Sequence, residues 1–194
     1  MFEAGGVWGS SVHLGNDRAD DLKRWRGAQK GRKNCEKQQS HTFMLRPYHG
    51  GMPTLLEGFS VIVELPVLWG DEDSFAHVNN VAYLRWCETG RVEYLRRIGM
   101  FPEVPPRGVG PIIASITCHY RRPLNYPDVV SVGTRVTSIG NTSFKMEQRI
   151  VSRNLQEIAA DAESTMVTLD YAAGKPVRVP DAVRAAIARF DGLR

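Results

Sequence analysis

The stretch Trp69-Gly-Asp-Glu-Asp-Ser-Phe-Ala-His-Val-Asn-Asn-Val-Ala-Tyr83 decides the fold, because a predicted strand ends here in carboxylates and a helix begins. Asp73 and His77 lie close together in the turn before the helix. The first turn of a helix has backbone N–H groups without intrahelical partners and carries the positive end of the helix dipole. An acid, a histidine and free backbone donors therefore meet at one place, and together they can attack a carbonyl and hold an oxyanion.

The residues on either side of this stretch predict a strand and a helix. Residues 59–67 alternate between apolar and other side chains, which is typical of a strand with one face in a core. Pro66 indicates that this strand lies near an edge or is about to end. We predict a helix with Asn80 as N-cap that ends near Arg97, because Gly99 is a natural C′ residue.

Four more strands and a short helix complete the predicted fold. The strands are expected over about residues 112–120, 130–136, 144–150 and 158–171, and the closing helix over 180–190. The apolar positions of the last strand change parity along its length, so we predict a β-bulge near residues 164–166. The order predicts an α+β fold in which an antiparallel five-stranded sheet packs on one long helix.

Composition places the chain among globular proteins. It has 194 residues, of which 42% are hydrophobic and 24% charged, and this is enough for one domain with a core. No apolar run is long enough to span a bilayer and the N-terminus lacks the apolar core of a signal peptide, so we expect a cytoplasmic protein without a membrane partner. Cys35, Cys87 and Cys118 are scattered without metal-ligand spacing and are expected to be reduced.

The net charge of +4 comes from the first part of the chain. Residues 1–51 hold 9 Lys+Arg and 5 Asp+Glu, a surplus of four, whereas residues 52–194 hold 16 of each. We therefore predict a basic, disordered leader over residues 1–51 and one folded domain over 52–194, and we expect no nucleic-acid partner. We also hypothesise that Met52 is the natural start, which the intact mass of the natively expressed protein would test.

Residues 69–94 closely resemble the signature of hotdog-fold acyl-CoA thioesterases of the 4-hydroxybenzoyl-CoA thioesterase group. Residues 119–128, His-Tyr-Arg-Arg-Pro-Leu-Asn-Tyr-Pro-Asp, resemble the end of that family's second strand, and residues 170–180 resemble its last strand and tail. The resemblance implies a hotdog fold, with the sheet wrapped around the central helix. It also implies homodimers that pair two sheets edge to edge, or homotetramers, with active sites at the subunit interface.

The resemblance assigns three catalytic groups. Asp73 matches the catalytic carboxylate, either as a nucleophile that forms an anhydride or as a general base on water, and the sequence leaves both routes open. The backbone N–H of Asn80 matches the donor that polarises the thioester oxygen. His77 matches the histidine of the signature and would shape the site, bind water or help with proton transfer.

Two positions depart from the family pattern. Ala76 stands where the signature commonly has glycine, so we expect the turn to avoid a conformation that only glycine tolerates. Phe75 stands where the related plant acyl-carrier-protein thioesterases have asparagine. We predict that Phe75 instead fills the acyl pocket and favours a particular chain length.

Further candidates for substrate binding come from the same stretches. Asn79 is expected to orient the loop, and Tyr83 to line the acyl pocket. Arg121 and Arg122 are candidate contacts for the phosphates of coenzyme A, because guanidinium groups bind phosphate oxygens in pairs.

The predicted function is hydrolysis of an acyl-CoA or acyl-carrier-protein thioester to a free acid and a thiol. We expect no metal and no cofactor beyond water, since the coenzyme is part of the substrate. The alternatives are a non-catalytic acyl-CoA-binding sensor and a hotdog hydratase or dehydratase. Asp73 discriminates the first of these, because sensing needs no carboxylate at the scissile carbon.

Overall fold

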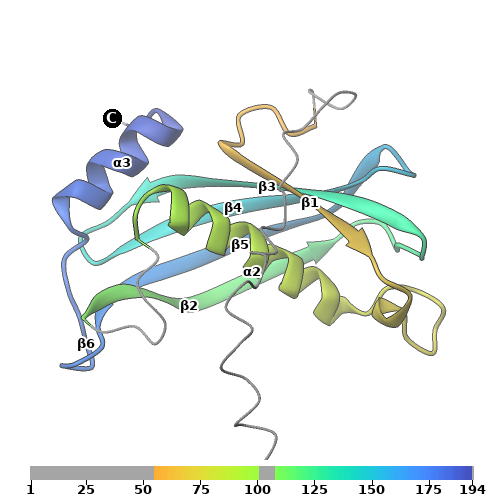
Figure 1. The fold of residues 1–194 in the computed structure, drawn as a ribbon, viewed down its shortest axis with the longest axis horizontal. Coiled ribbons are helices and arrows are strands. Elements are labelled where there is room, and N and C mark those ends of the chain that lie inside the picture. The colour runs from red at the N-terminus through yellow and green to blue at the C-terminus, as the bar shows by residue number, and fades with distance from the viewer. Residues whose placement is uncertain (1–54, 101–107, 194) are drawn as a thin grey trace, which may run out of the picture. The chain divides into compact units, whose positions relative to one another are not determined.

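The computed structural model describes residues 55–100 and 108–193, so the predicted leader lies outside the described residues. The described part is an antiparallel sheet with two α-helices (Figure 1). Its elements are β1 (Val61–Val67), a 3-10 turn η2 (Trp69–Asp71), α2 (Asn80–Arg97), β2 (Val109–Tyr120), β3 (Asp128–Ile139), β4 (Ser143–Ser152), β5 (Glu157–Asp170), β6 (Lys175–Pro176) and α3 (Asp181–Asp191).

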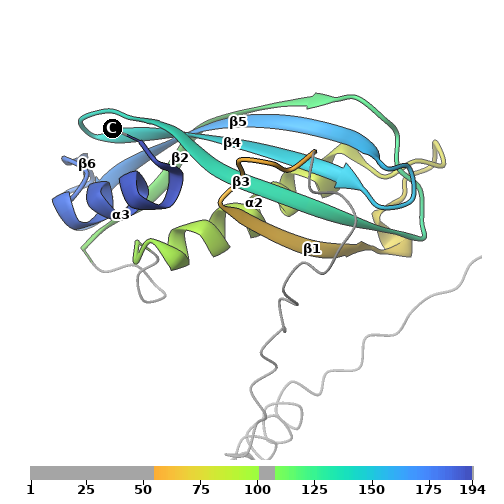
Figure 2. The same cartoon turned by 90° about the horizontal axis from the view of Figure 1, so that it is seen from above.

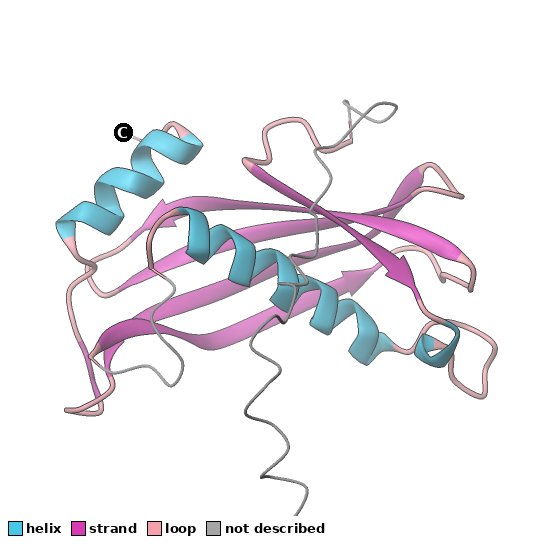
Figure 3. Ribbon diagram, in the orientation of Figure 1, coloured by secondary structure: helices cyan, strands magenta, loops and turns pink. Residues whose placement is uncertain are grey.

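The five predicted strands form the sheet in the order β1-β3-β4-β5-β2, and every pairing between them is antiparallel. The two-residue strand β6 adds a short pairing to the end of β5. Helix α2 crosses one face of the sheet, and α3 lies at one end of it (Figures 2 and 3). The architecture is therefore the one that the element order in the sequence predicts.

The core lies between α2 and the sheet. Along β4, Phe144, Met146 and Ile150 are buried, whereas Lys145 between them is exposed on the other face. The helix contributes its buried face to the same cluster, including Tyr94 and Cys87 at 0% exposure. Burial of one face per element accounts for the alternation that the sequence displays.

Helix and sheet lie close together at Gly90. A Cβ atom at this position would lie 2.6 Å from the Thr134 hydroxyl oxygen, so only glycine fits without a shift. Beside it, the buried Gln148 donates to the Cys87 carbonyl at 2.7 Å and accepts from the Arg91 guanidinium at 3.3 Å. This contact fixes the height of α2 above the sheet.

The prediction for the end of α2 is confirmed and that for its beginning is wrong by one residue. Ile98 is the C-cap and Gly99 has a φ of 72°. At the other end the N-cap is Asn79, whose side-chain oxygen accepts from the Val81 N–H at 2.9 Å, and Asn80 is the first helical residue. Two adjacent asparagines are equivalent as caps in sequence, so only the backbone distinguishes them.

The sheet does have an irregularity beside residues 164–166, as predicted, but the extra residue lies on β2 and not on β5. Alternate residues from Ala160 to Thr168 face the core throughout, and Ala162, Ser164 and Met166 are all buried. Polar Ser164 and Thr168 occupy inward positions, which gives the apolar residues a false change of parity. Ile113 pairs with Met166 and Ser115 with Thr165, so Ala114 of β2 is the extra residue. The pairing with β4 shifts separately at Ile150 and Val151, nearer the start of β5.

The two long edges of the sheet are β1 and β2. β1 has seven residues and contains Pro66, as expected of an edge strand. β2 has twelve residues, and Ile112 and Ile113 on it are 41% and 39% exposed. Within the described residues, no helix has both the length and the apolarity needed to cross a membrane.

Candidate active site

The three consecutive acids in the turn between β1 and α2, Asp71 to Asp73, make different contacts. Asp71 is buried, accepts from the Leu68 N–H at 2.9 Å and pairs with Arg85 at 3.2 Å. Glu72 accepts from the backbone N–H of Tyr126 at 2.9 Å. Two of the three carboxylates therefore hold the chain in place.

Asp73 has different surroundings from its neighbours. One of its carboxylate oxygens accepts from the Phe75 N–H at 2.8 Å, and the other from the Asn79 side-chain amide at 3.4 Å. Among the described residues, no ion pair includes Asp73. Its carboxylate is half-buried, held by neutral donors, and not neutralised by a cation.

The expectation for Ala76 is wrong. Its φ is 59°, in the left-handed region that glycine adopts without penalty and alanine only with strain. The turn thus keeps the left-handed conformation without a glycine. It is held by backbone bonds from Ala76 N–H to the Asp73 carbonyl at 3.0 Å and from Asp73 N–H to the His77 carbonyl at 2.9 Å. These contacts compensate for the strain.

The first turn of α2 leaves one backbone donor available. The Val81 N–H is capped by the Asn79 side chain, and the Ala82 N–H donates to the Asn79 carbonyl at 2.9 Å. The Asn80 N–H has no acceptor within the part of the chain that the structure describes. It lies at the positive end of an 18-residue helix, where a negatively charged oxygen is favoured.

Asn80 is one of the residues that line a cavity of about 300 Å³. Five of the eight predicted site residues line it: His77, Asn80, Tyr83, Arg121 and Arg122. Its other lining residues are Val78, Tyr120 and Pro123.

The other three predicted site residues lie outside this lining. Asp73 and Asn79 belong to the adjoining turn, where they contact each other. Phe75 is 81% exposed and contributes nothing to the cavity of the single chain.

The sequence analysis does not single out Tyr120, which is a wall of the cavity. Its ring meets that of Tyr83 edge to face at 5.2 Å, and its hydroxyl donates to the Asn80 carbonyl at 3.4 Å. The available signal is its parity with Cys118 on β2, which places both on the face toward α2. Burial raises the pKa of Tyr83 to about 12, so this hydroxyl stays protonated and donates to the Arg122 carbonyl.

Arg121 and Arg122 both form ion pairs and both remain about half exposed. Arg121 pairs with Asp161 and Arg122 with Glu157. Burial acts to raise the pKa of Asp161, but Arg149 and Arg121 outweigh it and lower the pKa, so this carboxylate stays ionised. The two arginines also line a neighbouring cavity of about 530 Å³ with Leu55, Tyr120, Gln156, Glu157 and Ile158.

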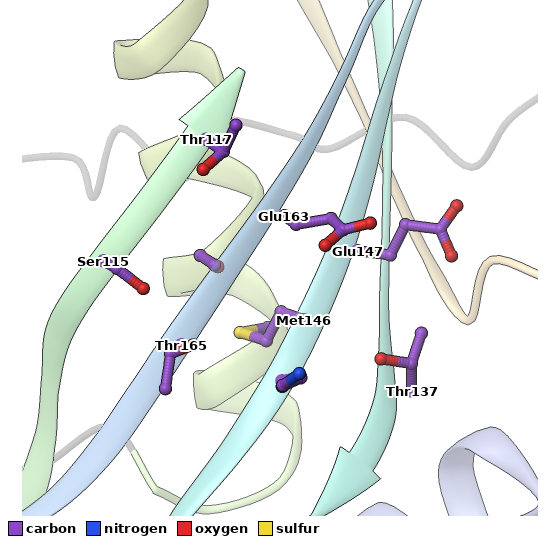
Figure 4. A pocket seen from close by; sticks show the side chains of 9 residues that line it. Ser115, Thr117, Thr137, Met146, Glu147, Glu163 and Thr165 are labelled. Atoms are coloured by element: carbon purple, nitrogen blue, oxygen red, sulfur yellow. The ribbon is translucent and has the colours of Figure 1, made fainter. Parts of the chain in front are cut away.

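A third hollow lies on the face of the sheet opposite α2 (Figure 4). Hydroxyl and charged side chains of four strands line it, among them Glu147 and Glu163 at paired positions of β4 and β5. It contains none of the predicted site residues.

The cysteines within the described residues are free thiols with little nucleophilic character. Cys87 is buried, and burial raises its pKa to about 12. Burial also raises the pKa of the half-buried Cys118. Both thiols are therefore protonated near neutral pH, which leaves the carboxylates and histidine of the turn as the candidate reactive groups.

Known proteins match the part of the chain that contains the sheet, the helices and the candidate site. A family model described as the thioesterase-like superfamily matches residues 67–187. A chloroplastic acyl-acyl carrier protein thioesterase of Arabidopsis thaliana is 31% identical over 129 residues, which is 66% of this chain and 67% of that protein. The Thermus thermophilus thioesterase structure complexed with coenzyme A and Zn is 31% identical, covers 70% of this chain and 97% of its own, and has a TM-score of 0.61.

The match to Protein THEM6 of Danio rerio is shorter. It is 34% identical over 93 residues, 48% of this chain, and spans 46% of the length of that relative.

Proposed function

Because this chain belongs to the thioesterase-like superfamily, we propose that it hydrolyses the thioester of an acyl-CoA to a free acid and a thiol. Family membership confirms the predicted relationship to hotdog-fold thioesterases and the predicted α+β class. The observation that carries the proposal is the cavity lined by His77 and Asn80 beside the turn that holds Asp73. Among the described residues the Asn80 N–H has no acceptor and the Asp73 carboxylate is in no ion pair.

Asp73 is proposed to supply the carboxylate of the reaction. As a nucleophile it would attack the thioester carbon and expel the thiolate, and water would then cleave the anhydride. As a general base it would take a proton from the attacking water. Either way the overall change is thioester plus water to acid plus thiol, and a thiolate needs little acid assistance to leave. No cofactor beyond water enters the proposal.

The Asn80 N–H and His77 are proposed to act on the other side of the scissile bond. A thioester oxygen placed against the Asn80 N–H would receive a hydrogen bond aligned with the helix dipole, which favours the negative charge that develops there. His77 is exposed at the rim of the same cavity, where it can hold water or pass a proton.

Coenzyme A is the carrier that the proposal favours. Arg121 and Arg122 use only some of their N–H groups to bind Asp161 and Glu157. Their side chains are 55% and 56% exposed. The remaining N–H groups can bind phosphate oxygens of the coenzyme. A relative crystallised with coenzyme A supports this choice, whereas the similarity to an acyl-carrier-protein thioesterase supports the other.

The acyl group is proposed to enter the cavity against Tyr83 and Tyr120, and a second copy of the chain to complete its walls. Among the described residues, no strand pairs with the outer edge of the twelve-residue strand β2, which carries the exposed Ile112 and Ile113. A homodimer formed along this edge would cover these side chains and bring a partner toward Phe75. This role for Phe75 requires the dimer, because the residue is exposed in the single chain.

The test is free thiol release from short, long and aromatic acyl-CoAs and from the matching acyl carrier proteins. Turnover with any of them supports hydrolysis, and the ratio between the two carriers identifies the preferred one. Binding of acyl-CoA without thiol release would refute the proposal and favour a sensor.

A further inference from the structure

The contact between Asn79 and Asp73 gives Asn79 a more specific role than the loop orientation expected from the sequence. We infer that Asn79 is a positioning residue that fixes the Asp73 carboxylate relative to the Asn80 N–H, rather than a residue that binds substrate. The inference rests on the proposed function for its catalytic part. Its geometric part stands on contacts between described residues alone.

The orientation of the Asn79 amide follows from its two partners. The side-chain oxygen accepts from the Val81 N–H at 2.9 Å, since the NH₂ group of the amide is a donor and cannot accept this hydrogen bond. The amide nitrogen must therefore point the other way, where it donates to the Asp73 carboxylate at 3.4 Å. One side chain thus caps the helix and holds the acid.

The backbone of Asn79 is itself held on both sides. Its N–H donates to the Asp71 carbonyl at 2.8 Å, and its carbonyl accepts from the Ala82 N–H at 2.9 Å. The next residue in the chain provides the Asn80 N–H of the proposed oxyanion site. The carboxylate and the oxyanion donor are therefore connected through a single, doubly anchored residue, which limits their relative displacement.

The neighbouring acids do not compete for the Asn79 amide. Asp71 is occupied by Leu68 and Arg85, and Glu72 by Tyr126. Asp73 receives one donor on each carboxylate oxygen, from Phe75 and from Asn79. Because each carboxylate oxygen has a second acceptor site, the acid remains able to reach water or a thioester carbon.

Substitution of Asn79 by serine separates positioning from capping. Serine caps a helix about as well as asparagine, but it has no amide to reach Asp73. We expect Asn79→Ser to lower kcat by about tenfold to a hundredfold with KM unchanged, because substrate is still bound while the carboxylate is less well placed. In the Asp73→Asn background the same substitution should have no further effect on kcat.

A second pair of variants tests the contact without using activity. Asn79→Asp keeps the cap but places two carboxylates against each other, so Tm should fall. In Asp73→Asn/Asn79→Asp the amide and the carboxylate change places, and the hydrogen bond can form again. We expect the double variant to lose less Tm than the sum of the two single variants.

The outcomes distinguish the positioning role from the proposed function. Additive effects on Tm would show that the two side chains do not interact and would overturn the inference even in an active enzyme. An equal fall in kcat on adding Asn79→Ser to wild type and to Asp73→Asn would overturn the catalytic part. If wild type releases no thiol while the Tm effects are non-additive, the contact stands, but both the proposed function and the catalytic part of this inference fail.

Discussion

The side-chain amide of Asn125 donates a hydrogen bond to the carbonyl oxygen of Ala76. It joins the loop between β2 and β3 to the turn that carries Asp73 and His77. The Val78 N–H also donates to this loop, to the Leu124 carbonyl at 2.8 Å. The candidate catalytic turn is therefore held from outside as well as by its own backbone bonds.

Removal of this contact should affect activity more than stability. We expect Asn125→Ala to lower kcat/KM by about tenfold, because the turn loses an external anchor, and to cost about 1 kcal/mol of stability. Asn154→Ala is the matched control, since it removes an amide-to-carbonyl bond to Pro127 of the same loop, a bond that does not involve a residue of the turn. Equal activity losses in the two variants, measured by thiol release, would contradict the prediction.

Glycine at position 76 should stabilise the protein. Alanine at a φ of 59° carries the strain of the left-handed region, and we expect Ala76→Gly to raise the free energy of unfolding by about 0.5–1 kcal/mol. Gly174 provides the reverse experiment, because its φ is 63° and a Cβ there would meet nothing within 4 Å. Gly174→Ala should lower the free energy of unfolding measured in urea. If neither variant changes that free energy, alanine carries no strain at these two positions and the prediction is wrong.

Helix α3 should depend on the hydrogen bond between Tyr94 and Asp191. The Tyr94 hydroxyl, fully buried on α2, donates to the Asp191 carboxylate, which also accepts from the Val136 N–H at 2.9 Å. We expect Tyr94→Phe to lower the free energy of unfolding by about 1.5–3 kcal/mol, because it removes a hydrogen bond to a charged acceptor. Tyr126→Phe, at a 48% exposed tyrosine, should cost almost nothing by comparison.

Stability should depend on pH through Glu93. The hydrogen bond from Arg96 is the main cause that lowers the pKa of Glu93 below its ordinary 4.5; burial opposes it and Arg97 assists. A lowered pKa gives stabilisation that is complete above 4.5 and is lost as pH falls through the folded-state value. Glu93→Gln should therefore lower Tm at pH 7 by about 2 °C. The deficit should shrink as pH falls below 4.5, and a deficit independent of pH would contradict this assignment.

The elements were predictable from sequence where one physical rule dominates. Alternation along residues 59–67 and 144–150 records one buried face, and Gly99 ends α2 because its left-handed backbone excludes most other residues. The core face of β5 was not predictable, because Ser164 and Thr168 are polar yet buried. Hydrophobic periodicity has no information about inward polar residues.

The site was predictable in its motif and not in its assembly. Two residues of the signature, His77 and Asn80, line one cavity, while their catalytic roles stay predictions. Tyr120 completes that cavity only because β2 places it against Tyr83, and the Asn79 amide faces Asp73 only because of the cap geometry. Both contacts join residues through tertiary structure, which local patterns do not encode.

The measurement that tests the central claim most directly is acyl-CoA turnover by Asp73→Asn beside Glu72→Gln. Each variant removes one negative charge from the same turn at constant size. Within the described part of the chain, however, the Glu72 side chain binds only the Tyr126 backbone, which glutamine can still do. We predict that Asp73→Asn loses at least about a hundredfold in kcat while it still binds acyl-CoA, and that Glu72→Gln stays within about twofold of wild type. Full turnover by Asp73→Asn would contradict the account, and so would an equal loss in both variants.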